Sequence, residues 1–181
     1  MACPSLVALA RDCQGAQIGG AETIYAISFK DLVPVSSATT EVYSASSNNI
    51  VISVGTSGST KFVKIAVAKN TAGFTESLKK DLTTGTNYIE QKVTIDVQGL
   101  STENRNFVES VRYQPIALLV KTRTKKWFLI GADGELELSA LEAGIGVKAD
   151  DGQGYKMTFD GVSANLALPV DSTIIASIVS A

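Results

Sequence analysis

The sequence predicts a mainly β protein, an antiparallel β-sandwich or barrel of about ten strands with one flanking α-helix and a long loop. Short segments in which apolar and polar residues alternate recur along the chain, mostly bounded by Gly, Asp or Ser. Only one internal segment has strong helical periodicity, whereas parallel sheets need a crossover helix for nearly every strand. With 181 residues, 45% of them hydrophobic and 19% charged, the chain can bury one core. We therefore expect a single domain over residues 1–181.

The first third of the chain is expected to hold a short helix followed by four strands. Leu6, Leu9 and Cys13 recur at helical spacing behind Ser5. Alternation of large and small side chains predicts the first strand over residues 22–30. The other strands are expected at residues 40–44, 48–54 and 61–68, with "GTSGST" joining the last two as a hairpin.

Residues 70–87, "NTAGFTESLKKDLTTGTN", are expected to form the long loop, because they lack alternation and are rich in Thr and Gly. Connections this long inside a compact domain tend to be functional, so we expect this one to order against a neighbouring copy. We expect it to be mobile in the monomer, so that shortening residues 72–84 leaves a folded monomer that does not polymerise. The residues expected to make the contact are two apolar anchors, Phe74 and Leu78, and three charged rim residues, Lys79, Lys80 and Asp81.

Residues 88–111 combine the most regular strand with the expected helix. The strand face expected to be buried carries Ile89, Val93, Ile95 and Val97. The wet face carries Glu90, Lys92, Thr94 and Asp96. Ser101 can cap the helix that follows, Phe107 and Val111 lie four residues apart on it, and Pro115 closes the segment.

The last third is expected to be all strand. The stretch "KKWFLIGADGELEL", residues 125–138, has the pattern of a regular hairpin. Trp127 and Phe128 are adjacent, so they should point to opposite faces of their strand. The strands are expected within residues 116–122, 126–131, 134–138, 154–161, 164–170 and 172–179.

Composition argues against an enzyme. The chain has no histidine, which removes the usual general base and the commonest metal ligand. Cys3 and Cys13 are its only cysteines, too few for a structural zinc site, and they either stay reduced or form a disulfide. A net charge of −2 argues against tight binding of nucleic acid through phosphates. We expect no signal peptide after Met1 and no membrane span, since no apolar run approaches about 18 residues.

Three motifs that could carry chemistry are better explained as ordinary turns and strand faces. "GTSGSTK" lacks the spacing of a phosphate-binding loop. Asp150 and Asp151 lie in a glycine-rich stretch that could suggest calcium, but they lack EF-hand spacing. Glu135 and Glu137 resemble a glycosidase carboxylate pair, yet on a strand they would share its solvated face. We therefore predict no catalytic, cofactor-binding or metal-binding residue.

Taken together, three stretches resemble structural proteins of tailed bacteriophages, of the type found in phages that infect Bacteroidetes. They are "DCQGAQIGGAETIYAI", "RNFVESVRYQPIALLVKTRTKKWFLIGADGELEL" and "DDGQGYKMTFDGVSANLALPV". The similarity spans most of the chain and is patchy between residues 35 and 75. The residues that fit the motif of the last stretch are Asp151, Gly154, Tyr155, Thr158, Phe159 and Gly161.

The resemblance implies a virion component, most plainly a tail tube subunit that assembles in the host cytoplasm into stacked hexameric rings. Its partners would be further copies of the chain and other virion proteins, with genomic DNA only as passing cargo. The resemblance also fits another virion ring, a neck, tail-terminator or head-decoration protein, because these share related sandwiches. A monomeric carbohydrate-binding module, using exposed Trp127 or tyrosines as a stacking platform, is the alternative from another class.

Overall fold

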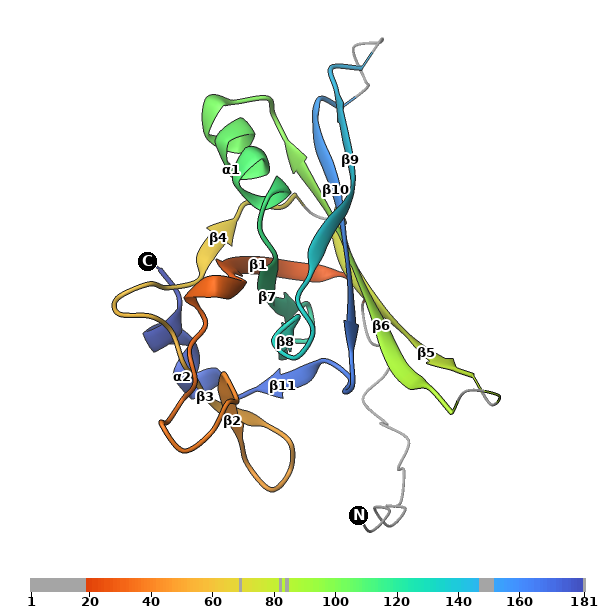
Figure 1. Ribbon diagram of the computed structural model, residues 1–181. Coiled ribbons are helices and arrows are strands. Elements are labelled where there is room, and N and C mark those ends of the chain that lie inside the picture. The colour runs from red at the N-terminus through yellow and green to blue at the C-terminus, as the bar shows by residue number, and fades with distance from the viewer. Residues whose placement is uncertain (1–18, 69, 82, 84, 147–151, 181) are drawn as a thin grey trace.

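The computed structural model describes residues 19–68, 70–81, 83, 85–146 and 152–180. Within these residues the protein has eleven strands in two sheets, two α-helices and one 3-10 helix. The long strands of the smaller sheet cross the strands of the larger one at a steep angle (Figure 1). The fold is therefore the mainly β sandwich that the sequence predicts, and its sheets do not close into a barrel.

The larger sheet has the strand order β2-β3-β11-β8-β7-β1-β4. Neighbouring strands are antiparallel, except that β3 and β11 meet in parallel at Val51 and Val170. A 3-10 helix, η1 (Phe29–Asp31), follows β1. The seven strands are β1 (Ala21–Ser28), β2 (Tyr43–Ala45), β3 (Val51–Val54), β4 (Val63–Ile65), β7 (Ile116–Thr122), β8 (Trp127–Ile130) and β11 (Leu168–Val170).

The smaller sheet has the strand order β5-β6-β10-β9 and is antiparallel throughout. Its strands are β5 (Ala72–Lys80), β6 (Asn87–Gln98), β9 (Glu137–Gly144) and β10 (Gly154–Ser163). The β5–β6 and β9–β10 hairpins project past the larger sheet at opposite ends (Figure 1). Parts of both hairpins therefore lie beyond the core of the subunit.

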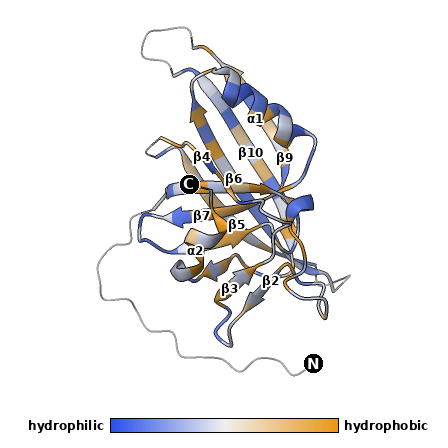
Figure 2. Cartoon of the chain, turned by 90° about the vertical axis from the view of Figure 1, so that its left-hand side faces the viewer, coloured by the Kyte–Doolittle hydropathy of each residue, from blue (hydrophilic) through white to orange (hydrophobic). Residues whose placement is uncertain are grey.

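The larger sheet is buried on both faces, which explains the uninterrupted apolar run of β7. One face packs on the smaller sheet and on α1 (Thr102–Arg112), and the other packs under α2 (Ser172–Ile178). Orange and blue residues alternate along the strands of the smaller sheet, which buries only one of its faces (Figure 2). The core between the sheets includes Ile24, Val93, Ile95, Leu118, Val120 and Phe159, and the core under α2 includes Ile27, Leu119, Leu129, Ile175 and Ile178.

Several expected elements are confirmed by the structure. The alternating strand is β6, and Ile89, Val93, Ile95 and Val97 are all buried on its core side. The expected helix is α1, whose first turn is capped at Ser101, where Oγ accepts a hydrogen bond from the N–H of Asn104 at 3.2 Å. Trp127 and Phe128 do point to opposite faces of β8, and each packs against a different core.

Other expectations about single elements are wrong. Residues 70–87 are not a loop, because half of them, Ala72–Lys80, form β5. "GTSGST" does not join a hairpin, since β3 pairs with β2 and β11 while β4 pairs with β1 at the opposite edge of the sheet. Residues 125–138 are not a hairpin either, because β8 belongs to the larger sheet and β9 to the smaller one. Residues 172–178 form α2 where a strand was expected over residues 172–179, so the described part of the chain has two flanking α-helices in place of one.

The turn between β8 and β9 carries the chain from one sheet to the other. Leu136 is fully buried and pairs with Ile116 of β7 just before β9 begins. Gly131 adopts a φ of +79°, a left-handed conformation that favours glycine. A Cβ on Gly134 would lie 1.7 Å from the carbonyl oxygen of Val162, so the backbones approach too closely for any other residue.

The expected N-terminal helix, with Cys3 and Cys13, lies outside the described residues.

Candidate assembly interface

The smaller sheet ends in two open strands, β5 on one side and β9 on the other. β5 has nine residues and β9 has eight, whereas the strands that end the larger sheet, β2 and β4, have three each. Within the described residues, no strand pairs with the outer edge of β5 or of β9. Long open edges are templates for pairing with another chain, and monomeric proteins usually block them. These two edges are therefore the candidate interface.

Two backbone hydrogen bonds determine which residues of β5 face outward. The N–H of Asp96 donates to the carbonyl of Thr71 at 2.9 Å, and the N–H of Asp81 donates to the carbonyl of Thr86 at 3.0 Å. In an antiparallel pair, residues that bond the partner strand alternate with residues whose N–H and C=O point away. Odd-numbered residues of β5 therefore bond β6. Its even-numbered residues direct their N–H and C=O towards the open edge.

The two apolar residues predicted to be assembly anchors have different environments. Phe74 is partly buried and packs on the core between the sheets, with its ring centroid 5.7 Å from that of Phe128. Leu78 lies on the same side of β5, opposite Ile89, but it is 62% exposed because the hairpin has passed the end of the core. Only Leu78 is free to contact another molecule. Removing residues 72–84 would delete part of the core, so a folded monomer is not expected from that deletion.

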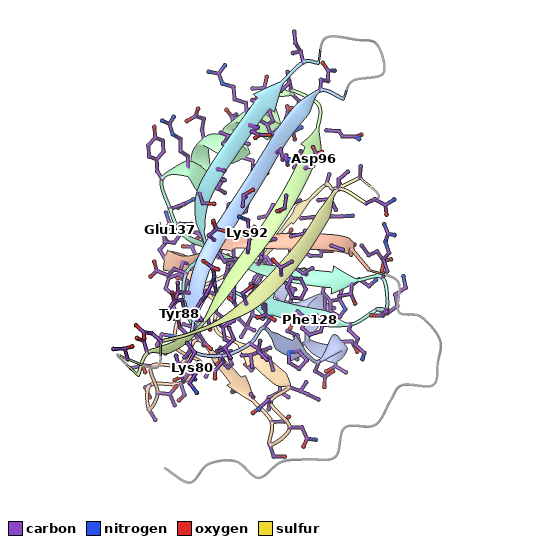
Figure 3. All side chains as sticks on the ribbon, turned by 90° about the vertical axis from the view of Figure 1, so that its right-hand side faces the viewer. Lys80, Tyr88, Lys92, Asp96, Phe128 and Glu137 are labelled. Carbon is purple, nitrogen blue, oxygen red and sulfur yellow. The ribbon has the colours of Figure 1, made fainter. Side chains whose placement is uncertain are left out.

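The three charged residues predicted at the rim shape the end of the β5–β6 hairpin. Lys79 forms an ion pair with Glu90 across the sheet, with Nζ 3.2 Å from Oε2. Asp81 accepts a hydrogen bond from the N–H of Thr83 at 2.8 Å through Oδ1, which closes the turn. Lys80 is exposed at the last position of β5 (Figure 3). All three are accessible from outside the subunit.

A buried polar contact, missed in the sequence, fixes β5 and β6 to the larger sheet. Gln91 is only 2% exposed, and its Nε2 donates to Glu76 Oε1 at 3.0 Å while its Oε1 accepts from the N–H of Gly131 at 3.3 Å. The N–H of Ala167 donates to the same oxygen of Glu76 at 2.6 Å. The sequence did contain a signal for this contact, because Gln91 is a polar residue between Ile89 and Val93 on the buried face of β6.

The solvent-facing side of the smaller sheet carries charges of both signs. Asp96 and Glu137 lie on this one face, together with Lys92 (Figure 3). Cross-strand ion pairs form between Lys79 and Glu90, Lys92 and Asp160, and Lys156 and Glu142, at 3.2, 3.8 and 3.9 Å. Five carboxylates, those of Glu90, Asp96, Glu137, Glu142 and Asp160, outnumber the three lysines. The face is therefore acid-rich.

A surface hollow beside β2 holds the most perturbed ionisable group of the described chain. The hydroxyl of Tyr43 donates to Asp133 Oδ2 at 3.1 Å, and Asn165 Nδ2 donates to the same oxygen at 3.1 Å. Burial, together with the Asp133 carboxylate, raises the pKa of Tyr43. The phenol stays protonated at neutral pH, so this cluster offers hydrogen bonds and no acid–base chemistry.

The acidic motifs weighed for metal or glycosidase chemistry are only partly described by the structure. Among the described residues, no group of three or more His, Cys, Asp or Glu side chains is placed to hold a metal ion. Glu137 begins β9 whereas Glu135 lies in the preceding turn with a φ of +27°, so the two do not form a pair along one strand. Asp150 and Asp151 lie outside the described residues.

None of the described helices has the length and apolar character needed to cross a membrane.

Comparisons of the chain with protein-family models, with curated proteins and with solved structures find no match. In the part of the chain that the structure describes, the protein is a β-sandwich whose smaller sheet has two long, open edges.

Proposed function

We propose that the chain is a non-enzymatic structural subunit that assembles into rings, with β5 of one copy pairing to β9 of the next. The observation that carries the proposal is that, among the described residues, both long edges of the smaller sheet are open. Pairing of unlike edges makes a head-to-tail contact, which generates a closed ring when the rotation between copies closes. Closure would remove every open edge of this sheet, as it does in a β-barrel.

The strand directions fit this mode of pairing. The sheet has four strands that alternate in direction, so β5 and β9 run in opposite directions. Rotation about a ring axis keeps the direction of each strand along that axis, so for strands that run along the axis, β9 of one copy would meet β5 of the next as an antiparallel partner. The alternation would then continue around the whole ring without interruption.

The acid-rich face of the smaller sheet would line the central channel of such a ring. Asp96 and Glu137 would lie on that lining, among carboxylates that outnumber lysines. Repulsion between these carboxylates and phosphates would keep DNA from binding to the wall. Together with the resemblance to tail proteins, these features favour stacked, hexameric rings that form a phage tail tube in the virion.

Leu78 provides the test, because its backbone N–H points to the open edge and its side chain is exposed. Leu78→Pro removes that N–H and leaves the β5–β6 ladder intact, since proline is tolerated at the open side of an edge strand. We expect this variant to fold, with an unchanged Tm, and to remain monomeric in analytical ultracentrifugation and negative-stain microscopy.

Leu78→Ala is the matched control, because it shortens the same side chain and keeps the N–H. We expect it to form rings or tubes at higher protein concentration than the wild type. Rings of Leu78→Pro that look like those of the wild type would refute pairing through β5. A wild type that stays monomeric at every concentration would refute the self-assembly itself.

The two alternatives predict different results in the same experiment. Another virion ring, neck, tail-terminator or head-decoration protein would give isolated rings or smaller oligomers in place of tubes. A carbohydrate-binding module would stay monomeric and bind on a glycan array. Of the aromatic residues considered for a sugar-stacking platform, Trp127 is partly buried between Tyr25 and the core under α2, whereas Tyr113 is exposed.

A further inference from the structure

The outer edge of β9 exposes the backbone groups of only some of its residues. The N–H of Gly99 donates to the carbonyl of Gln153 at 2.9 Å, so odd-numbered residues of β10 bond β6 and even-numbered residues bond β9. These even-numbered residues lie opposite Glu137, Ala140, Glu142 and Gly144, with Ser139 unpaired at a bulge. The other residues of β9 direct their N–H and C=O towards the open edge, and they are Leu138, Leu141 and Ala143.

The side chains of these three residues lie on the core-facing side of the sheet. Leu138 and Leu141 are opposite Phe159 and Met157, which are both fully buried. Leu141 is nevertheless 41% exposed, since within the described chain no strand lies beyond β9. It is therefore an apolar side chain on the core-facing side of an edge that lacks a neighbour.

The open edge of β5 has the same arrangement. Its even-numbered residues direct their N–H and C=O outward, and Leu78, one of them, lies on the core-facing side and is 62% exposed. In an antiparallel pair, two residues that exchange both hydrogen bonds also have their side chains on one face. Because the sheet has four strands, the outward residues of both edges share the core-facing side, whereas an odd number of strands would put them on opposite faces. β5 and β9 can therefore pair with hydrogen bonds and faces both matched.

Matched hydrogen bonds and faces leave a choice among registers that differ in steps of two residues. In one of them Leu78 lies opposite Leu138, and Lys79 lies opposite Glu137 on the solvent-facing side. The whole of β9 then pairs within β5, against residues 73–79. This register joins an apolar pair on one face and an opposite-charge pair on the other.

The two neighbouring registers are less favourable. A shift in one direction puts Leu78 opposite Leu136, which is fully buried and already pairs with Ile116. A shift in the other direction puts the carboxylates of Asp81 and Glu137 opposite each other, and like charges in that position are destabilising. The register between them is therefore the one that the two edges favour.

We propose that Leu78 of one copy lies opposite Leu138 of the next copy and covers the exposed part of Leu141, which fixes the register of the β5–β9 contact. This inference rests on the proposed pairing of these strands and adds the side chains that align them. Directly opposite side chains lie about 4.5–5.5 Å apart and diagonal ones about 7–8 Å, so one leucine can reach both residues. The end of the β5–β6 hairpin, which passes the core of its own subunit, extends the apolar core of its neighbour.

The test of the register is a disulfide between copies. Thr75 lies opposite Glu142 in the proposed register, so the variant with Thr75→Cys and Glu142→Cys should cross-link when the assembled protein is mildly oxidised. Such a pair, which shares no hydrogen bonds, has Cα atoms about 4.5 Å apart, within the reach of a disulfide. Within one copy the two residues are three strand spacings apart, roughly 14 Å, which is too far for a bond. We therefore expect a ladder of linked copies on a non-reducing gel.

Matched controls report the two shifted registers. They are Gly73→Cys and Ser77→Cys, each combined with Glu142→Cys. A Cβ on Gly73 meets no atom within 4 Å and Ser77 is exposed, so both changes should be tolerated. We expect much less cross-linking from them, because diagonal residues are about 7–8 Å apart. Peptide mapping identifies which residues each disulfide joins, so bonds of the native cysteines are recognised separately.

A second experiment tests the leucine contact. We expect Leu141→Asp to raise the critical concentration for assembly at least roughly tenfold, because the contact would bury an unpaired carboxylate. The control is Ile52→Asp on β3 of the larger sheet, where the side chain is 47% exposed and far from both edges in strand order; it should leave assembly unchanged. Thermal melts of each variant separate loss of assembly from loss of folding.

The outcomes separate this inference from the proposed function. Strongest cross-linking in either control variant would refute the register while the pairing of β5 with β9 stands. Normal assembly of folded Leu141→Asp would refute the leucine contact. Disulfides that join two β5 strands, or assembly with no disulfide in any of the three variants, would refute both the register and the β5–β9 pairing. If the wild type never assembles, both proposals fall.

Discussion

Replacing Gln91 by leucine should destabilise the fold by removing the polar contact between the two sheets. Leucine has nearly the volume of glutamine, so the substitution opens little space. What it removes is the acceptor for the N–H of Gly131 and the donor to Glu76. Gly131 is buried, so its N–H cannot turn to water. Glu76 keeps the hydrogen bond from Ala167.

The expected loss follows from the two groups left without a partner. A buried donor or acceptor left unsatisfied costs about 1–3 kcal/mol. The N–H of Gly131 should contribute this full range, and Glu76, which is partly exposed and keeps one donor, should contribute the low end. The free energy of unfolding should therefore fall by about 2–4 kcal/mol. For a domain of this size, each kcal/mol lowers the Tm by about 2–4 °C.

The assay is urea unfolding followed by tryptophan fluorescence, since Trp127 packs on the core under α2. Gln98→Leu is the matched control, because Gln98 is the exposed last residue of the same strand and its loss should change stability by less than about 0.5 kcal/mol. A Gln91→Leu protein as stable as the wild type would refute the reasoning, since it would mean that the polar contact merely replaces apolar packing of equal value.

Three further substitutions test other parts of the fold by thermal or urea unfolding. Phe74→Ala should lower the free energy of unfolding by about 2 kcal/mol, because it empties a partly buried site and removes an aromatic pair. An unchanged stability would mean that the core does not need Phe74, which would then be available for contact with another copy. Gly161→Ala should cost about 1–3 kcal/mol through its clash with the turn beneath it, whereas Gly73→Ala, with open space around it, should not. Asp171→Ala should lower the Tm by uncapping α2, and Asp171→Asn should lower it less, because the amide oxygen still accepts the hydrogen bonds. Because donors from Thr173 lower the pKa of Asp171, the part of this stabilisation that depends on the charge is present at neutral pH and is lost as the pH falls through the folded-state pKa; a difference between wild type and Asp171→Ala that does not shrink in acid would contradict it.

Sequence patterns predicted the elements whose signal is complete within the segment. β6 buries one face over most of its length, so its alternation is complete and its residues are recognised correctly. The first turn of α1 is capped by Ser101, which directly precedes the helix. The alternation and the cap can both be seen in the sequence, although the hydrogen bonds of β6 are made to β5 and β10.

The failures come from contacts that are distant in sequence. β5 shows no alternation because its second half lies beyond the core, so neither face of that part is selected to be apolar. The sequence of α2 predicted a strand because "STIIASI" is short and apolar. The helix forms because Asp171 caps its first turn and because it packs on the larger sheet. Whether β8 and β9 pair depends on which sheet each one joins, and no local pattern contains that information.

The same reasons limit what the sequence could say about the candidate interface. Leu78 and Phe74 were both proposed as anchors from their residue types; Leu78 is exposed, whereas the core already buries much of Phe74. An edge is defined by strand order, so β9 could not be recognised as open before the two sheets were known. The clustering of Glu137 with Asp160 and Glu90 likewise depends on the folding of β9, β10 and β6 into one sheet.

The division of β5 at Glu76 has a consequence for how the chain tolerates variation. Before that residue the strand is held by Phe74 in the core, and after it the strand projects into solvent from Ser77 to Lys80. A substitution scan along these nine residues should therefore show a break in its phenotype. Changes in the first half would lower the yield of soluble protein. Changes in the second half would leave the yield intact and would affect only the proposed assembly between copies. Under the proposed self-assembly, variants that express normally but fail to form rings should accumulate among Ser77–Lys80.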